Sequence, residues 1–255
     1  MKTLLIILIA LFAIGLLSFI ALKLTLSLNE GNAEKYAVAN MPKDENSPLK
    51  GKNLIFLGSS VTLGFASKHE AIADMIAHKD GANVIKEAVN GTTLVETRSK
   101  LGGGESYITR LKRLDKNLKV DALIVQLSTN DANSKIELGK ISDSKDISSF
   151  NTKTIIGAME YIIAYAEETW HCPTIIYSGP DFHNPLYTQM NEAVKELQKK
   201  WNIGFVDLFD DKDINTKYIT KDYISDAGYK PIHPTRKGYQ AWLPYFEKEI
   251  AKWVS

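Results

Sequence analysis

From Lys52 onward, short apolar runs alternate with longer segments in which apolar residues recur every three or four positions. The short runs have the length of buried β-strands, and the periodic segments have the spacing of amphipathic α-helices. The predicted strands cover residues 53–57, 83–89, 120–127, 174–177 and 203–207. The predicted helices cover residues 69–78, 106–117, 154–169, 187–201 and 236–253. This alternation predicts an α/β domain built from parallel βαβ units, with helices on both faces of a five-stranded sheet.

The N-terminal residues follow a different pattern. Leu4 to Leu22 is a run of nineteen residues without a charge, with Lys2 before it and Lys23 after it. A helix of that length rises about 28 Å, close to the thickness of a bilayer core. The length favours a retained membrane anchor, and the alternative is a cleaved signal peptide. Both predict an exported protein, with Lys2 on the cytoplasmic side of an anchor.

The remaining chain divides into a short polar segment and one domain. Residues 28–50 contain two prolines and little apolar periodicity, which predicts a linker. Residues 51–255 are enough for one sizeable core but not for two. We therefore expect an anchor or signal segment at 1–27, a linker at 28–50 and one folded domain at 51–255.

Charge and cysteine content restrict the function further. The 31 basic and 30 acidic residues give a net charge of +1, so no basic face for nucleic-acid binding is expected. Cys172 is the only cysteine, which excludes an intramolecular disulfide. It precedes an apolar run, where a small buried hydrophobe is expected rather than a catalytic thiol. Export without disulfides suits the envelope of a Gram-positive bacterium.

Polar residues follow several predicted strands at their carboxyl ends, where ligands gather in parallel sheets. These turns hold Ser60, Asn90-Gly91, Ser128-Thr129-Asn130-Asp131 and Gly179-Pro180-Asp181. A serine hydroxyl becomes a nucleophile when an imidazole takes its proton. Of the five histidines, His233 is the best candidate because Pro231 and Pro234 restrict its loop.

An ester-cleaving site also needs donors for the developing oxyanion. Gly91 allows close approach of the backbone, and Asn130 offers a side-chain amide. The alternative role for Asn130 is an Asx turn that caps the following segment.

Four sequence blocks together resemble the SGNH, or GDSL-like, hydrolase family. They are Gly58-Ser59-Ser60-Val61-Thr62, Ala88-Val89-Asn90-Gly91-Thr92-Thr93, Ser128-Thr129-Asn130-Asp131 and His233-Pro234-Thr235-x-x-Gly238-Tyr239. They occur in the family's order between about residues 51 and 255. Ser59 stands where the family has aspartate, and Ser128 stands where glycine is usual. Ser59 is the alternative nucleophile, and the match to the block favours Ser60.

The resemblance implies a flavodoxin-like three-layer αβα fold that needs no metal and no cofactor. It implies hydrolysis of an acyl ester, with Ser60 as nucleophile and His233 as general base. It also implies an oxyanion site formed by the Ser60 N–H, the Gly91 N–H and the Asn130 amide.

One departure affects the acid of the triad. The family's aspartate lies three residues before the histidine, and that position here is Lys230. Asp226, seven residues before His233, is the candidate that orients the imidazole. Asp222 is a weaker candidate, and a backbone carbonyl is a third possibility that would leave a dyad.

The expected function is an extracytoplasmic serine acylesterase acting on short-chain, O-acetyl esters of cell-envelope carbohydrate. The alternatives are a lipid esterase of the lipase or lysophospholipase type, an acyltransferase to a glycan, and a non-catalytic glycan-binding module. The expected partners are an acylated carbohydrate or lipid ester, and the membrane through the N-terminal segment. Gly102-Gly103-Gly104, with Tyr107 and Arg110, is expected to form either a rim beside the pocket or an ordinary solvated loop.

Overall fold

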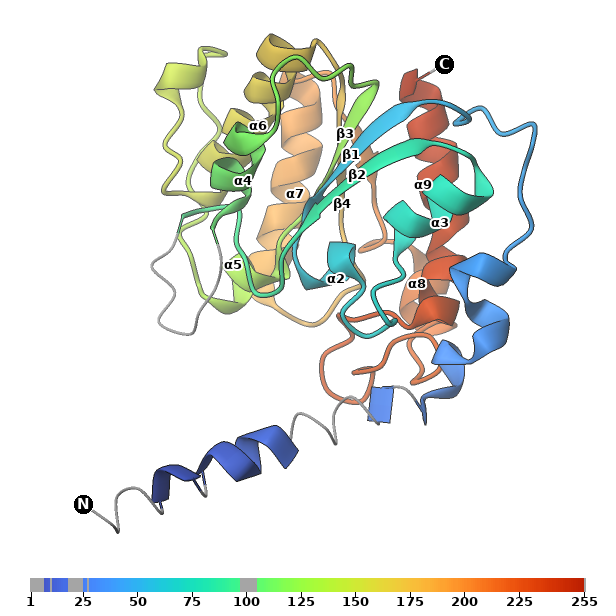
Figure 1. Cartoon of the computed structure of the whole chain (residues 1–255). Coiled ribbons are helices and arrows are strands. Elements are labelled where there is room, and N and C mark those ends of the chain that lie inside the picture. The colour runs from blue at the N-terminus through green and yellow to red at the C-terminus, as the bar shows by residue number, and fades with distance from the viewer. Residues whose placement is uncertain (1–6, 10, 18–24, 27, 97–104, 255) are drawn as a thin grey trace.

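A single sheet of five parallel strands forms the centre of the protein (Figure 1). The computed structural model describes residues 7–9, 11–17, 25–26, 28–96 and 105–254. The strands are β1 (Asn53–Gly58), β2 (Asn83–Ala88), β3 (Ala122–Gln126), β4 (Thr174–Tyr177) and β5 (Gly204–Val206). Their order in the sheet is β2-β1-β3-β4-β5. The predicted strands and their parallel pairing are thus confirmed.

Helices cover both faces of the sheet (Figure 1). One layer contains α3 (Ile72–Lys79) and α9 (Arg236–Val254), and the other contains α4 (Tyr107–Arg113), α6 (Ile155–Trp170) and α7 (Pro185–Lys200). This arrangement confirms the predicted three-layer αβα fold. The sequence did not predict α2 (Ser60–Leu63), α5 (Thr129–Asn133), α8 (Lys212–Thr216) or the 3₁₀ turn η4 (Ile147–Ser149), because such short elements show no periodicity.

The core lies on both sides of the central strands. All residues of β3 are buried, whereas β2 at the edge of the sheet is half exposed. From α9, Trp242 and Phe246 are fully buried, and the Phe246 ring packs 4.9 Å from the ring of Tyr177 in β4. Each such side chain stabilises the fold by about 1.5–3 kcal/mol through burial. The packing of α9 fixes the loop before it, which carries His233.

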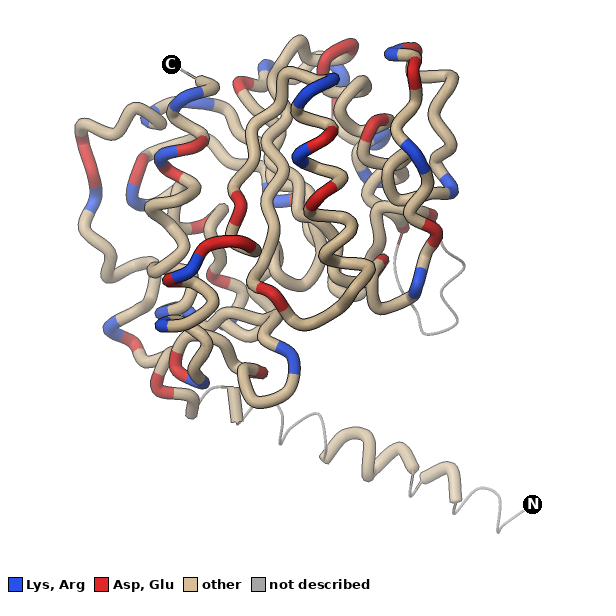
Figure 2. Tube along the Cα trace, turned by 180° about the vertical axis from the view of Figure 1, so that it is seen from behind, with Lys and Arg blue, Asp and Glu red and all other residues tan. Residues whose placement is uncertain are grey.

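Acidic and basic residues are interspersed over the view from behind (Figure 2). Neither sign dominates the view from behind, in agreement with the near-equal totals of 31 and 30.

Only part of the predicted hydrophobic segment is described. Residues 7–9 and 11–17 are helical and their side chains are exposed, while the rest of Leu4–Leu22 lies outside the described residues. Among the helices of the described residues, none has the length and apolar character needed to cross a membrane.

Residues 28–50 differ from the predicted linker, because the structure packs them against the domain. Three short 3₁₀ helices, η1 (Glu30–Asn32), η2 (Glu34–Tyr36) and η3 (Val38–Asn40), lie along α9 and α3. Asn32, Ala37 and Leu49 are at most 2% exposed. The buried side chains are of mixed type and come from short 3₁₀ turns, so the sequence shows no apolar periodicity here. We call residues 29–41 the N-terminal strap.

Candidate active site

The turn after β1 places Ser60 and Ser59 in different environments. Ser59 is the residue before α2 and is fully buried, with its Oγ donating to Gln126 Oε1 at 3.3 Å. Ser60 begins α2, and its Oγ lies 3.0 Å from His233 Nε2. Ser60 therefore faces the imidazole, and Ser59, the alternative nucleophile, points into the core.

Gln126, the last residue of β3, holds the turn in place. Its buried Oε1 accepts the backbone N–H groups of Ser59 at 2.9 Å and Thr62 at 3.2 Å, and the Thr62 hydroxyl at 2.8 Å. A buried carbonyl oxygen with several donors restrains the backbone around Ser60. The sequence analysis missed Gln126 because a single polar residue at a strand end gives no pattern that separates it from a surface residue.

An antiparallel bridge between Ile224 and Pro234 brings Asp226 and His233 close together. Asp226 Oδ2 lies 2.6 Å from His233 Nδ1. Its Oδ1 accepts the backbone N–H groups of Ile232 at 3.0 Å and His233 at 2.9 Å. One carboxylate therefore holds both the ring and the backbone of the histidine. In the tautomer that satisfies both contacts, Nδ1–H donates to Asp226 and Nε2 accepts from the Ser60 hydroxyl.

The other acid candidate is engaged elsewhere. The Asp222 carboxylate pairs with Lys237 at 3.3 Å, and its backbone carbonyl accepts the Thr235 hydroxyl. Lys230, at the position of the family's aspartate, donates to Asn133 Oδ1 at 2.9 Å. The structure thus brings Asp226, and not Asp222, to the imidazole.

The two candidate oxyanion residues follow the strands that flank β1. Gly91 lies in the turn after β2, and Asn130 lies in α5, just after β3, so both segments are at the same end of the sheet as Ser60. Gly91 has φ +74°, a conformation that disfavours other residues. Asn130 Nδ2 donates to the Thr92 carbonyl at 2.9 Å, which joins the two loops and leaves a second N–H on the amide. Ser128 caps α5, so the capping role considered for Asn130 belongs to Ser128.

Arg110 is buried beneath this edge of the sheet and does not form a rim. Its guanidinium donates to the carbonyls of Gly58 and Glu87, both at 2.8 Å, and to Thr92 Oγ1 at 3.1 Å. Tyr107 is also fully buried. Both residues were expected in a rim or a solvated loop, and they contribute to the core instead. Gly102-Gly103-Gly104 lies outside the described residues.

Asp131, next to Asn130, is a buried carboxyl group. Burial raises its pKa to about 6, although the N–H groups of Leu94 and Val95 donate to it at 2.9 and 3.2 Å. These bonds fix the segment that follows Gly91 relative to α5.

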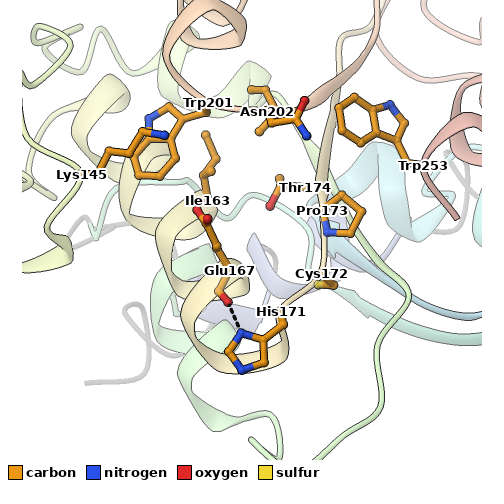
Figure 3. Close-up of a pocket in the computed structure, with 11 residues that line it drawn as sticks. Lys145, Ile163, Glu167, His171, Cys172, Pro173, Thr174, Trp201, Asn202 and Trp253 are labelled. Carbon is orange, nitrogen blue, oxygen red and sulfur yellow. Dashed lines mark hydrogen bonds between the residues drawn. The ribbon is translucent and has the colours of Figure 1, made fainter.

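A cavity of about 510 Å³ lies at the opposite edge of the sheet, where β4 and β5 begin (Figure 3). Its lining includes Lys145, Glu167, His171, Cys172, Trp201 and Trp253, and none of the predicted site residues. Cys172 is 6% exposed, and burial raises the pKa of its thiol to about 12, which agrees with a structural role. The arrangement around Ser60 is therefore separate from this cavity.

Comparisons with known proteins identify the family of the chain. The GDSL-like lipase/acylhydrolase family matches residues 56–241. No curated protein matches the chain.

Several solved structures share the fold. A protein from Lactobacillus plantarum is 16% identical, with a TM-score of 0.60, and the match covers 78% of this chain and 96% of that one. A protein from Bacteroides ovatus named as a GDSL-like lipase is 15% identical over 78% of this chain and 97% of its own, with a TM-score of 0.57. A carbohydrate acetylesterase family member from Sinorhizobium meliloti is 15% identical over 80% and 99%, with a TM-score of 0.56. Because the family match spans well over half of its length, the chain belongs to the GDSL-like lipase/acylhydrolase family.

Proposed function

We propose that this ester hydrolase removes short acyl groups, O-acetyl groups above all, from cell-envelope carbohydrate by an acyl-enzyme mechanism on Ser60. The observation that carries the proposal is the chain of contacts from Ser60 Oγ to His233 Nε2, at 3.0 Å, and from His233 Nδ1 to Asp226 Oδ2, at 2.6 Å. A nucleophile, a base and a group that orients the base are the components of an activated serine.

In the acylation step, Ser60 Oγ attacks the ester carbonyl carbon while His233 Nε2 takes the hydroxyl proton. Asp226 keeps the ring in the required tautomer and stabilises the imidazolium that forms. The carbonyl oxygen becomes an oxyanion, which the N–H groups of Ser60 and Gly91 and the Asn130 amide stabilise. Collapse of this intermediate breaks the bond to the alcohol, which leaves with the proton from His233.

In the deacylation step, water attacks the acyl group on Ser60, and His233 takes a proton from that water. The second tetrahedral intermediate collapses to the free carboxylic acid, and the proton on His233 returns to Ser60 Oγ. The sum is one ester and one water converted to one acid and one alcohol.

A hollow beside the segment between Asp226 and His233 supports the proposal that the substrate is a sugar ester. It has a volume of about 200 Å³, and its lining includes Asp181, His183, Asn215, Gly228 and Tyr229. Tyr229 is 85% exposed, which suits stacking against a sugar ring, and the polar groups suit its hydroxyls. The name of the Sinorhizobium meliloti structure, a carbohydrate acetylesterase family member, points the same way.

The hydrophobic run Leu4–Leu22 supports an extracytoplasmic location, with the enzyme held at the cell membrane by a retained anchor.

The test is hydrolysis by the purified full chain of acetylated glycans and of aryl esters with short and long acyl chains. We expect release of acetate from the glycans, faster turnover of short aryl esters, and covalent labelling of Ser60 by a fluorophosphonate. Ser60→Ala should abolish turnover and labelling, whereas Ser59→Ala should keep the labelled site. A clear preference for long acyl chains would contradict the substrate class, and an unlabelled Ser60 would contradict the mechanism.

A further inference from the structure

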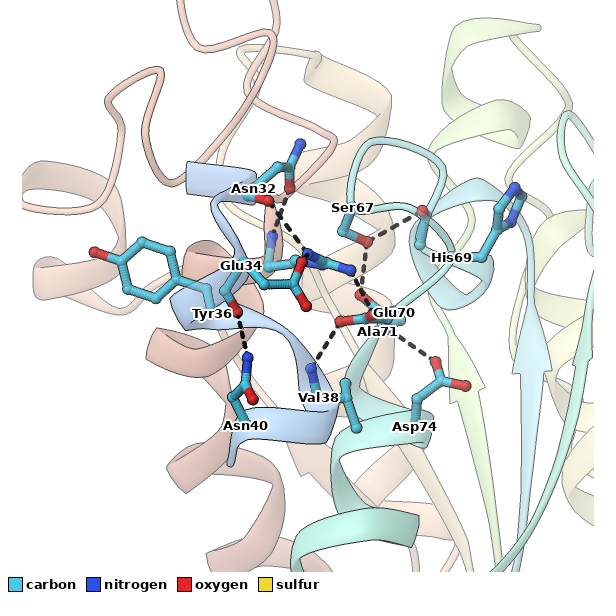
Figure 4. Close-up of polar contacts among 12 residues, drawn as sticks. Asn32, Glu34, Tyr36, Val38, Asn40, Ser67, His69, Glu70, Ala71 and Asp74 are labelled. Atoms are coloured by element: carbon cyan, nitrogen blue, oxygen red, sulfur yellow. Dashed lines mark hydrogen bonds and ion pairs between the residues drawn. The ribbon is translucent and has the colours of Figure 1, made fainter. Parts of the chain in front are cut away.

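The N-terminal strap contacts the loop after α2, the helix that begins at Ser60, and the start of α9, just after His233. Figure 4 shows the strap beside residues 67–74, with Val38 bonded to Glu70. It lies outside residues 56–241, the part that matches the family. The contacts of the strap with the domain are therefore not part of the family match.

Asn32 is the centre of these contacts and is fully buried. Its Nδ2 donates to the Ala66 carbonyl at 2.7 Å, and its Oδ1 accepts the Arg236 backbone N–H at 3.0 Å. One side-chain amide thus joins two loops that are 170 residues apart in the sequence.

The loop on the Ser60 side is closely tied to the nucleophile. Ala66 lies six residues after Ser60, and the Ser60 carbonyl accepts the N–H groups of Gly64 and Phe65 at 3.1 and 3.0 Å. The ring of Phe65 packs against the His233 ring, with 5.3 Å between the ring centroids. A shift of this loop therefore moves both the serine and the surface that supports the imidazole.

The loop on the His233 side is held at several points. Arg236 begins α9 three residues after His233, and its buried guanidinium pairs with Glu70 at 2.6 Å. The same Glu70 accepts the Val38 N–H of the strap at 2.8 Å. A Cβ on Gly31 would lie 1.7 Å from the Asp222 carbonyl oxygen, so the strap backbone rests directly on this loop.

We propose that the N-terminal strap sets the distance between Ser60 and His233, and that Asn32 is its positioning residue. This inference rests on the proposed function, because it concerns the same pair of side chains. Removal of the amide leaves a buried carbonyl and a buried N–H without partners, which favours separation of the two loops. A displacement of about 1 Å between reacting groups lowers the rate up to about a hundredfold.

The test compares Asn32→Ala with Asn40→Ala in the full chain. Asn40 is also in the strap but is exposed, and its side-chain amide donates to the Glu34 carbonyl of the strap itself. With a short aryl ester, Asn32→Ala should lower kcat by about ten- to a hundredfold and leave KM within about twofold. The rate of fluorophosphonate labelling should fall in parallel, and Asn40→Ala should change neither quantity. A folded Asn32→Ala variant that keeps the parent kcat would overturn the proposal.

A second readout separates this inference from the proposed function. The NMR signals of the His233 ring report its surroundings without any turnover, and we expect them to move in Asn32→Ala and to stay in Asn40→Ala. A parent chain that neither hydrolyses esters nor reacts with the probe contradicts the function, whereas unmoved ring signals in Asn32→Ala contradict the strap. If Asn32→Ala does not fold, Glu70→Gln weakens the same junction, and unmoved His233 signals in that variant overturn the proposal.

Discussion

His233 Nδ1 lies 2.6 Å from Asp226 Oδ2, although seven sequence positions separate the two residues and not the usual three. The bridge between Ile224 and Pro234 closes the intervening residues into a hairpin, which keeps Asp226 beside the imidazole. The spacing along the chain has changed while the contact has been kept. Asp226 also binds the backbone N–H of His233, which gives the acid a second hold on the same residue.

We expect Asp226→Asn to lower kcat by about 10²- to 10⁴-fold with little change in KM. The amide keeps an acceptor for the backbone but presents an N–H to Nδ1, which favours the wrong tautomer. Steady-state kinetics with a short aryl ester measure the effect. Asp222→Asn is the matched control, because the Asp222 carboxylate pairs with Lys237. Equal losses in both variants would remove Asp226 from its proposed role.

Asn130→Ala should lower kcat by about 10²- to 10³-fold, because the change removes the proposed oxyanion donor and the contact with the Thr92 carbonyl. Asn133→Ala changes an exposed asparagine of the same short helix and should stay within about twofold of the parent. Thermal unfolding of both variants shows whether the fold is kept. If kcat of a folded Asn130→Ala matches that of Asn133→Ala, the oxyanion assignment fails.

Tyr229→Ala tests the proposed role of the 200 Å³ hollow in binding a sugar. Loss of the exposed ring should raise KM for an acetylated glycan by about fivefold or more, since a stacking contact contributes on the order of 1 kcal/mol. The loss in kcat/KM should be larger for the glycan than for an aryl acetate, which does not fill the hollow. Equal losses on the two substrates would place the sugar elsewhere.

The buried Asp131 predicts a specific dependence of stability on pH. Its pKa is about 6 in the folded chain and 3.8 ordinarily, so between these values the folded state holds more protons than the unfolded state. The free energy of unfolding contributed by Asp131 is therefore highest below about pH 4 and is lost as the pH rises to about 6.

Urea unfolding of the parent and of Asp131→Asn at pH 4, 5, 6 and 7 measures this contribution. The stability of the parent relative to the variant should decrease from pH 4 to pH 6 and then level off. A difference that increases over this interval would contradict the burial effect, and a constant difference would do the same.

The sequence predicted the sheet well because its strands are buried on both faces and read as continuous apolar runs. The run at 120–127 shows this, since every residue of β3 is buried. The helix at 236–253 was equally clear, because Trp242 and Phe246 repeat at helical spacing and fill the core.

The buried polar contacts were not predicted. Gln126, Arg110 and Asn32 are among the most buried residues, yet each belongs to a type that is usually exposed. Their partners are mostly backbone groups of distant segments, and such contacts do not change the local pattern of apolar and polar residues. Ser60, His233 and Asp226 could be proposed from motif and proximity in sequence, but only the folded chain shows that the hairpin brings Asp226 to the ring.

The strap also limits the distance between the folded domain and the hydrophobic run at the N-terminus. Asn29 Nδ2 bonds to the Lys221 carbonyl at 2.9 Å, and only six residues separate Asn29 from Leu22. Seven peptide steps extend to at most about 24 Å. Under the proposed membrane anchorage, this length places Asn29 within about 24 Å of the end of the hydrophobic run. The ester substrates are then expected to lie close to the lipid headgroups.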